Sequence, residues 1–179
     1  IGLPTEGVSF RIAHAPELGL PAGVGELLIH TPAIMSGYLD DPPLTAKAFD
    51  SDYFKTGDLA AIREDGNVQL VGRTKDIVSR GGNKIAPLEI ENLFARHDGV
   101  ASVLAFGMPD ERIGETLHLM VVRRDAGLNE KDLRQWAADR LERFKIPDAF
   151  HFVETLPAGG TGKTDRAAAR RALEERRLS

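Results

Sequence analysis

Residues 53–91 read YFKTGDLAAIREDGNVQLVGRTKDIVSRGGNKIAPLEIE, and the character of the chain changes within this stretch. Up to residue 73, two runs rich in apolar residues flank a short polar segment centred on Asp65–Gly66 or Gly66–Asn67. Apolar runs separated by such a turn predict a β-hairpin. Beyond this point the spacing of apolar residues becomes helical. We therefore place a domain boundary near Lys75.

The chain before this boundary is β-rich. Short β-type runs at residues 8–13 and 25–30 are bounded by glycine and proline. A weak helical period appears only at residues 44–49.

The chain after the boundary alternates helices and strands. The expected elements are a helix that begins with Pro87 and ends before Gly99, strands over 101–107 and 116–124, a helix over 129–144 capped by Asn129, a strand over 150–153, and a helix from about Asp165. This order predicts an α+β fold: a small carboxyl-terminal domain with a short sheet and flanking helices, preceded by a β-rich subdomain.

Composition narrows the class of protein. The chain has 179 residues, 42% hydrophobic and 28% charged, which suits a packed globular fold. A net charge of −4 argues against a nucleic-acid binder. No apolar run approaches membrane-spanning length, and cysteine is absent, which fits a cytoplasmic location. The first residue is not methionine, so we expect a piece of a longer protein.

Residues 156–166, LPAGGTGKTDR, end in the Gly-Lys-Thr of a phosphate-binding loop. Such a loop has its first glycine five positions before the Gly-Lys pair, where this chain has Pro157, which lacks an N–H group. Only fifteen residues follow Thr164, too few for the further strands of a nucleotide-binding sheet. The sequence therefore favours a catalytic lysine on a glycine-rich loop that is not a phosphate-binding loop.

Three segments taken together resemble the carboxyl-terminal third of the adenylate-forming enzyme superfamily. They are residues 53–91, VASVLAFGMPDERIGETLHLMVV at 100–122, and LERFKIPDAFHFVETLPAGGTGKTDR at 141–166. The superfamily includes acyl-CoA synthetases, adenylation domains of nonribosomal peptide synthetases and firefly luciferases. The motifs occur in the family's order along essentially the whole chain.

The resemblance implies a truncated enzyme with two parts. Residues 1–74 correspond to the last, β-rich subdomain of the large amino-terminal adenylation domain, and residues 75–179 to the complete carboxyl-terminal lid domain. In the family, the acid and ATP form an acyl-adenylate and pyrophosphate. The small domain then rotates, and a thiol, usually that of coenzyme A, attacks the adenylate.

Three residues near the boundary match positions of the family that concern the nucleotide and the hinge. Asp58 of the Thr-Gly-Asp motif matches the aspartate that accepts hydrogen bonds from both ribose hydroxyls, although an isolated aspartate beside glycine is more often a turn residue. Arg73 matches an arginine near the ribose. Lys75 matches the hinge, where the backbone dihedral angles change between conformations.

The segment SRGGNKIAPLEIE, residues 79–91, matches the loop that enters the active site during thioester formation. Gly81 and Gly82 fall at the expected tunnel for coenzyme A, and Gly82 matches the glycine that lets the pantetheine arm pass. Lys84 stands where other members carry a basic residue near phosphate. We assign no chemistry to Glu89 and Glu91.

Lys163 matches the catalytic lysine that contacts the substrate carboxylate and the α-phosphate during adenylation. A mobile ammonium can follow the negative charge that develops as carboxylate attacks phosphorus. Residues 157–163 also have the Pro-x-x-x-x-Gly-Lys form that is acylated in some bacterial members. This raises the hypothesis that a lysine acyltransferase and deacylase act on Lys163 and switch the enzyme.

No catalytic or metal-binding role is predicted for the five histidines or for three arginines of the last helix. The five histidines, His14, His30, His97, His118 and His151, show no spacing typical of metal ligands, so no metal site is predicted in this chain. Arg166, Arg170 and Arg171 are interpreted as a solvated face of the last helix.

The family's phosphate loop, its Mg²⁺-binding glutamate and its acyl pocket lie upstream of this stretch. The expected ligands are a carboxylic acid, ATP or AMP and coenzyme A, with Mg²⁺ carried by ATP, and the missing amino-terminal domain is the expected partner. We expect the 179 residues alone to be inactive. Two alternatives to an acyl-CoA synthetase stay open: an adenylation domain that loads a carrier protein, and a non-catalytic interaction module.

Overall fold

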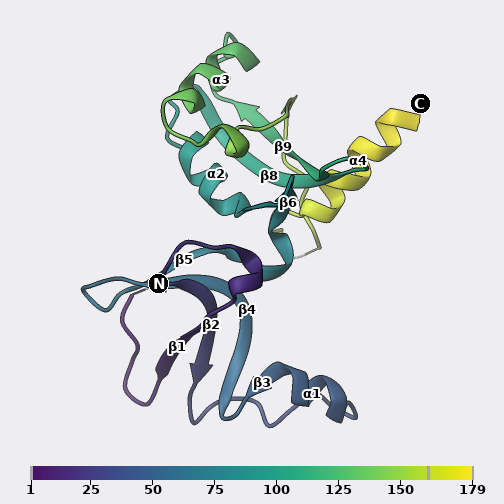
Figure 1. Ribbon diagram of the computed structural model, residues 1–179. Coiled ribbons are helices and arrows are strands. Elements are labelled where there is room, and N and C mark those ends of the chain that lie inside the picture. Colours follow the sequence, from purple (N-terminus) through teal and green to yellow (C-terminus); the bar gives the residue numbers. More distant parts are fainter. Residues whose placement is uncertain (1, 161, 179) are drawn as a thin grey trace. The chain divides into compact units, whose positions relative to one another are not determined.

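The computed structural model describes residues 2–160 and 162–178. The chain divides into two compact units, Ile1–Lys75 and Asp76–Ser179, called here the amino-terminal and carboxyl-terminal units. In Figure 1 the first unit is purple to blue and the second teal to yellow. Among the described residues, no helix combines the length and hydrophobicity needed to cross a membrane.

The amino-terminal unit is one five-stranded antiparallel sheet with the order β1-β2-β4-β3, in which β5 pairs with β4. Its elements are β1 (Ser9–Ala13), the 3-10 helix η1 (Pro16–Leu18), β2 (Val24–His30), α1 (Pro42–Ala48), β3 (Phe49–Asp50), β4 (Tyr53–Ile62) and β5 (Val68–Arg73). Its small core contains Leu27, Ala60 and Val68.

The hairpin expected over residues 53–73 is confirmed as β4 and β5. Gly66 has φ +79°, a left-handed conformation that glycine adopts without steric cost. The Asp65 carboxylate accepts the Asn67 N–H at 3.0 Å, which lowers the Asp65 pKa and fixes the turn. The local turn chemistry visible in the sequence therefore sets the register of the two strands.

The carboxyl-terminal unit is a mixed five-stranded sheet with the order β10-β9-β6-β7, in which β8 pairs with β9. Its elements are η2 (Thr74–Asp76, which begins in the other unit), β6 (Val78–Arg80), β7 (Asn83–Ile85), α2 (Pro87–Phe94), β8 (Val100–Asp110), β9 (Gly114–Arg123), α3 (Glu130–Ala138), η3 (Arg143–Lys145), β10 (Ala149–Val153) and α4 (Arg166–Leu178). Only β10 runs parallel to its neighbour, β9.

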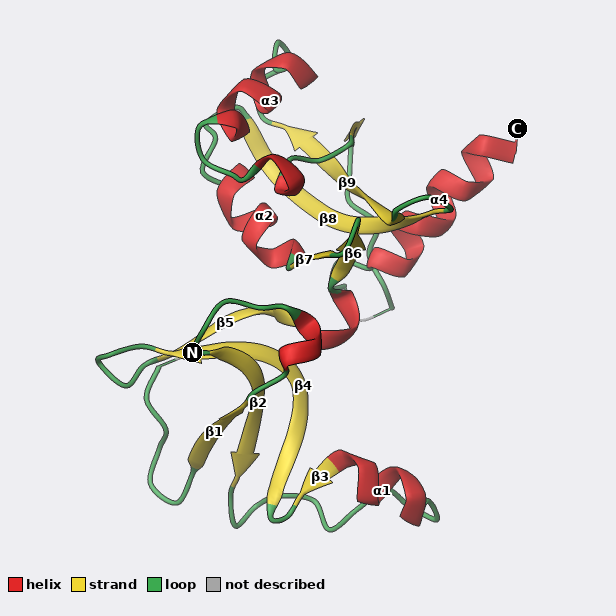
Figure 2. Ribbon diagram, viewed as in Figure 1, coloured by secondary structure: helices red, strands yellow, loops and turns green. Residues whose placement is uncertain are grey.

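Two apolar clusters cover opposite faces of this sheet. Because side chains alternate along a strand, Ala105 of β8 packs with Phe94 of α2 and Leu133 of α3, whereas Phe106 packs with Ala169 of α4. Figure 2 shows α2 and α3 on one side of β8 and β9 and α4 on the other. The α+β architecture expected from the sequence is confirmed.

The helix expected over 129–144 is shorter than predicted. Asn129 caps it as expected, and its side chain accepts the Asp132 N–H at 3.2 Å, but α3 ends at Ala138. The Arg140 side chain donates to the Trp136 carbonyl, an acceptor that one more helical hydrogen bond would have used. Leu141 and Phe144 still pack on the core, from a turn and η3 rather than from the helix.

The strands expected over 101–107 and 116–124 are longer than predicted and form one hairpin. Strands β8 and β9 pair from Val100↔Arg123 to Asp110↔Gly114. The Asp110 carboxylate accepts the N–H groups of Arg112 and Ile113, which lowers its pKa and closes the turn. The sequence pattern does not predict this extension, because Pro109 and the charged residues around it are unusual within a strand.

Candidate functional site

Asp58 and Arg73 form an ion pair across the β4–β5 hairpin. They stand opposite each other in register, and Arg73 Nε donates to Asp58 Oδ1 at 2.7 Å. The Asp58 side chain is 25% exposed and that of Arg73 is 53% exposed. A carboxylate accepts several hydrogen bonds, so the contact with Arg73 leaves acceptor capacity for further donors.

The Thr-Gly-Asp motif is held by β2. Thr56 Oγ1 donates to the Leu27 carbonyl and accepts the Asp58 N–H, and the Gly57 N–H donates to Glu26 Oε1. Gly57 has φ +71°, which a residue with a side chain rarely adopts. These bonds fix the backbone that carries the Asp58 carboxylate.

Lys75 is exposed in η2 and is the last residue of the amino-terminal unit. Its neighbour Asp76, the first residue of the carboxyl-terminal unit, is fixed there by an ion pair with Arg166 at 3.2 Å. The predicted hinge residue therefore precedes a residue that is anchored in the second unit.

Gly81 and Gly82 form the turn between β6 and β7. Their φ angles are +54° and +84°, so both adopt a left-handed conformation that favours glycine. A Cβ at either position would meet nothing within 4 Å. The backbone conformation, not crowding within the described chain, therefore accounts for glycine here.

Lys84 stands opposite Ser79 in the β6–β7 hairpin, and its ammonium donates to Ser79 Oγ at 2.7 Å. The side chain is partly buried. One donor is thus used within the hairpin, and a lysine ammonium has three.

Lys163 is exposed on a small closed loop. The loop is held by a bridge between Ala158 and Thr164 and by the Asp165 N–H, which donates to the Pro157 carbonyl at 2.9 Å. Thr161 lies outside the described residues. Lys163 therefore lies on a loop whose two ends are joined to each other by hydrogen bonds, and these ends are called here the base of the loop.

Two described amides of this loop bond to carbonyl groups of the loop itself. The Gly159 N–H donates to the Lys163 carbonyl, and the Gly162 N–H donates to the Gly159 carbonyl. A phosphate-binding loop directs successive N–H groups at a ligand instead. This hydrogen bonding agrees with the rejection of the phosphate-loop interpretation.

The solvated-face interpretation is wrong for Arg166. Its guanidinium donates to the Ala105 carbonyl at 3.0 Å and forms ion pairs with Asp76 at 3.2 Å and Glu91 at 2.6 Å. Arg170 also forms an ion pair, with Glu115 at 3.3 Å, whereas Arg171 is 62% exposed. Arg166 therefore joins the start of α4 to α2, β8 and the first residue of the unit.

Glu91, to which no role was assigned, is the central acceptor of this network. It accepts hydrogen bonds from the Ala105 N–H and from Arg166. Burial raises the Glu91 pKa above its ordinary value, although both hydrogen bonds oppose the shift. Glu89 is more exposed and forms an ion pair with Lys145.

The spacing of the histidines in the sequence does not indicate that two of them meet, because His118 and His151 lie 33 positions apart. Parallel pairing of β10 with β9 brings His151 beside the buried His118, with His118 Nδ1 and His151 Nε2 2.9 Å apart. Thr116 Oγ1 lies 3.1 Å from His118 Nε2. Within residues 2–160 and 162–178, no group of three or more His, Cys, Asp and Glu side chains is arranged to hold a metal ion.

Three comparisons identify the relatives of this chain. Residues 89–163 match the family model of the AMP-binding enzyme C-terminal domain. A propanoyl:CoA ligase of Mycobacterium tuberculosis, whose acyl group carries a dioxo-octahydroindenyl ring system, is 40% identical over 144 residues, which are 79% of this chain and 28% of that protein.

Solved structures share the fold. ATP-bound MatB from Rhodopseudomonas palustris matches with a TM-score of 0.88 and 33% identity, over 97% of this chain and 35% of that one. The amide bond synthetase McbA from Marinactinospora thermotolerans matches with a TM-score of 0.87 and 29% identity, over 96% of this chain and 35% of that one. The chain therefore belongs to the adenylate-forming superfamily, over the part that corresponds to the carboxyl-terminal region of its members, and it spans about a third or less of their length.

Proposed function

We propose that this chain is the carboxyl-terminal part of an ATP-dependent acyl-CoA synthetase. The observation that carries the proposal is the 40% identity to a CoA ligase over 79% of this chain, and the match of residues 89–163 to the AMP-binding enzyme C-terminal domain supports it. In the first step, a carboxylate oxygen attacks the α-phosphorus of ATP and pyrophosphate leaves. In the second, the thiol of coenzyme A attacks the acyl carbon, loses its proton and releases AMP.

In the first step, Lys163 contacts the substrate carboxylate and the α-phosphate. An exposed ammonium on a loop with a fixed base suits this role because it reaches outward without disturbing the fold. Asp58 accepts the ribose hydroxyls with the acceptor capacity that Arg73 leaves free, and Arg73 lies beside the ribose. The Mg²⁺ ion enters with ATP, and its protein ligand belongs to the upstream segment.

In the second step, the segment that carries Gly81, Gly82 and Lys84 faces the acyl-adenylate. The two glycines leave open space at the turn for the pantetheine arm, and Lys84 offers an ammonium to phosphate. Rotation at Lys75 exchanges the Lys163 loop for this turn. Residues 1–74 and 75–179 are accordingly parts of the two domains that alternate.

Lys163 is also the proposed site of regulation. Acylation by a lysine acyltransferase would neutralise its charge and remove the contact to developing negative charge, and a deacylase would restore it. The exposure of the side chain makes it accessible to such an enzyme. Incubation with an acyltransferase and acyl donor, followed by peptide mass spectrometry, tests this; an unmodified Lys163 beside modified lysines would refute it.

One observation supports a different acceptor for the acyl group: the amide bond synthetase McbA shares the fold over 96% of this chain. In that case an amine, not a thiol, would attack the adenylate. A carrier-protein thiol is the remaining acceptor of the same chemical class as coenzyme A.

Product analysis discriminates these acceptors. The full-length protein that contains this chain is incubated with ATP, a panel of carboxylic acids, and either coenzyme A, amines or a carrier protein. We expect acyl-CoA, AMP and pyrophosphate in equal amounts, and no product from the 179 residues alone. Amide or acyl-carrier formation without acyl-CoA would overturn the proposal in favour of that acceptor.

A further inference from the structure

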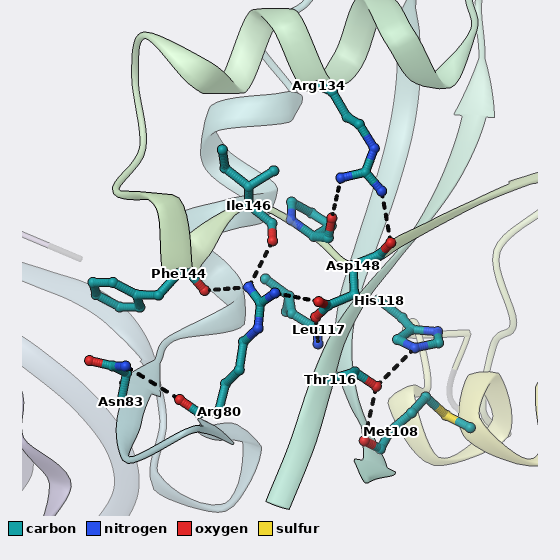
Figure 3. A network of polar contacts seen from close by, with 11 residues as sticks. Arg80, Asn83, Met108, Thr116, Leu117, His118, Arg134, Phe144, Ile146 and Asp148 are labelled. Carbon is teal, nitrogen blue, oxygen red and sulfur yellow. Dashed lines mark hydrogen bonds and ion pairs between the residues drawn. The ribbon is translucent and has the colours of Figure 1, made fainter. Parts of the chain in front are cut away.

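Arg80 directly precedes the Gly81–Gly82 turn, yet its guanidinium points away from the turn, into the chain that crosses from α3 to β10 (Figure 3). Nη1 donates to the carbonyl oxygens of Phe144 at 2.6 Å and Ile146 at 2.9 Å. Nη2 donates to Asp148 Oδ1. The side chain is only 19% exposed, so these contacts account for much of its polar surface.

The segment that Arg80 contacts is itself fixed from two other sides. Asp148 accepts the Leu117 N–H with Oδ2 at 2.8 Å, and the Asp148 N–H donates to the Leu117 carbonyl at 2.7 Å, which ties the segment to β9. From α3, Arg134 donates to the carbonyls of Pro147 at 2.9 Å and Asp148 at 2.7 Å. Arg80 is therefore attached to a rigid support.

The glycine turn has other attachments close to its base. The Ser79 N–H donates to Glu115 Oε2 of β9 at 2.8 Å, and Asn83 Nδ2 donates to the Arg80 carbonyl at 3.4 Å. Strand β6 pairs with β9 through one residue pair, Arg80↔Gly114, and the Gly81 N–H donates to the Ile113 carbonyl at 2.8 Å. A Cβ at Gly81 or Gly82 would meet nothing within 4 Å, so the tip of the turn is open. The position of the tip is set at its base, and Arg80 is the side chain that joins this base to the support.

We propose that Arg80 is a positioning residue for the thioester-forming step: through Phe144, Ile146 and Asp148 it holds the glycine turn in the place where coenzyme A passes. The role rests on the proposed function. It requires the planar fork of a guanidinium, which reaches three acceptors at once, and a lysine ammonium offers no such fork. Arg80 itself contacts no reacting atom.

The test uses Arg80→Lys in the full-length protein and measures the two steps separately. Adenylation is followed by ATP–pyrophosphate exchange, and thioester formation by single-turnover transfer from preformed acyl-adenylate to coenzyme A. We expect transfer to fall by roughly 10- to 100-fold, because a displacement of about 1 Å at a reacting centre can cost this much. Pyrophosphate exchange is expected to stay at the wild-type rate.

The matched control is Arg134→Lys. Arg134 contacts the same segment but not the glycine turn, so a merely structural role of the segment would affect both variants. We expect Arg134→Lys to leave the ratio of the two steps unchanged. Asp148→Asn, which removes the charge and keeps one of the two acceptor oxygens that Arg80 and the Leu117 N–H use, is a second variant in case Arg80→Lys does not fold.

Hydrogen exchange of the full-length protein gives a readout that is independent of activity. In Arg80→Lys, amides of residues 78–85 are expected to exchange faster while those of residues 101–107 stay protected. Equal loss of both steps in a folded variant, loss of neither, or the same selective loss in Arg134→Lys would overturn the positioning role alone. A wild-type protein that catalyses neither step would overturn the proposed function, and this role with it.

Discussion

At the scale of residues, Lys163 and Arg166 lie three positions apart and have opposite environments. Lys163 is exposed on its loop, whereas the Arg166 side chain is 24% exposed and bonded to three partners. The glycines around Lys163 indicate, from the sequence alone, that this lysine lies on an exposed loop. The partners of Arg166 could not be predicted, because Asp76 and Glu91 lie 90 and 75 positions away and a local pattern cannot show which charges meet.

Glu91→Gln tests the buried carboxylate. Because burial raises the folded-state pKa of Glu91, the folded protein binds this proton more tightly than the unfolded protein. The contribution of Glu91 to the free energy of unfolding is therefore full below the unfolded pKa and falls as the pH rises through the folded pKa. We expect the free energy of unfolding of the wild type, relative to Glu91→Gln, to decrease over this window.

Urea unfolding followed by the fluorescence of Trp136, the single tryptophan of the chain, reports on the carboxyl-terminal unit. The matched control is Glu174→Gln on the exposed side of α4, which should keep the pH dependence of the wild type. An identical pH dependence in Glu91→Gln and the wild type would contradict the burial effect.

Asp58→Asn tests the proposed ribose contact in the full-length protein. Hydrogen bonds to a charged acceptor contribute about 1.5–3 kcal/mol, so we expect the KM for ATP to rise by roughly 10-fold or more. Asp52→Asn, at an exposed position between β3 and β4, is the control and should leave the KM unchanged. Steady-state kinetics with varied ATP measure the effect, and an unaltered KM in Asp58→Asn would remove Asp58 from the nucleotide site.

At the scale of elements, local signals predicted what local chemistry determines. The β4–β5 turn, the proline at the start of α2 and the cap of α3 were all visible in the sequence. The early end of α3 and the full length of β8 and β9 were not. At the end of α3, the Arg140 side chain contacts the Trp136 carbonyl. Strands β8 and β9 extend because their pairing includes Pro109.

Asn129→Ala tests the cap of α3. Asn129 accepts the Asp132 N–H, and Asp132 accepts the Asn129 N–H, so both halves of a capping box are present. Loss of the cap should lower the free energy of unfolding by about 1 kcal/mol. Urea unfolding monitored by Trp136 fluorescence measures this, with Lys131→Ala on the same first turn as the control. Equal stability of Asn129→Ala and the control would show that the cap contributes nothing.

At the scale of the whole molecule, the sequence predicted the fold class and the family, because several motifs occur in order along the chain. The match of residues 89–163 to the AMP-binding enzyme C-terminal domain and the shared fold with MatB confirm both. Seven role assignments stay predictions, because each concerns a contact with ATP, the acid or coenzyme A, or a movement between domains, and not a contact within the chain. They are those of Asp58, Arg73, Lys75, Gly81, Gly82, Lys84 and Lys163.

The central claim is that Lys163 serves adenylation in a protein of this family. The most direct measurement is ATP–pyrophosphate exchange by the full-length protein with a panel of carboxylic acids, for the wild type, Lys163→Ala and the exposed-lysine control Lys131→Ala. We predict exchange with at least one class of acid, a loss of roughly 100- to 1,000-fold in Lys163→Ala, as when a donor to developing charge is removed, and wild-type exchange in the control. Exchange by Lys163→Ala at the wild-type rate would contradict the account.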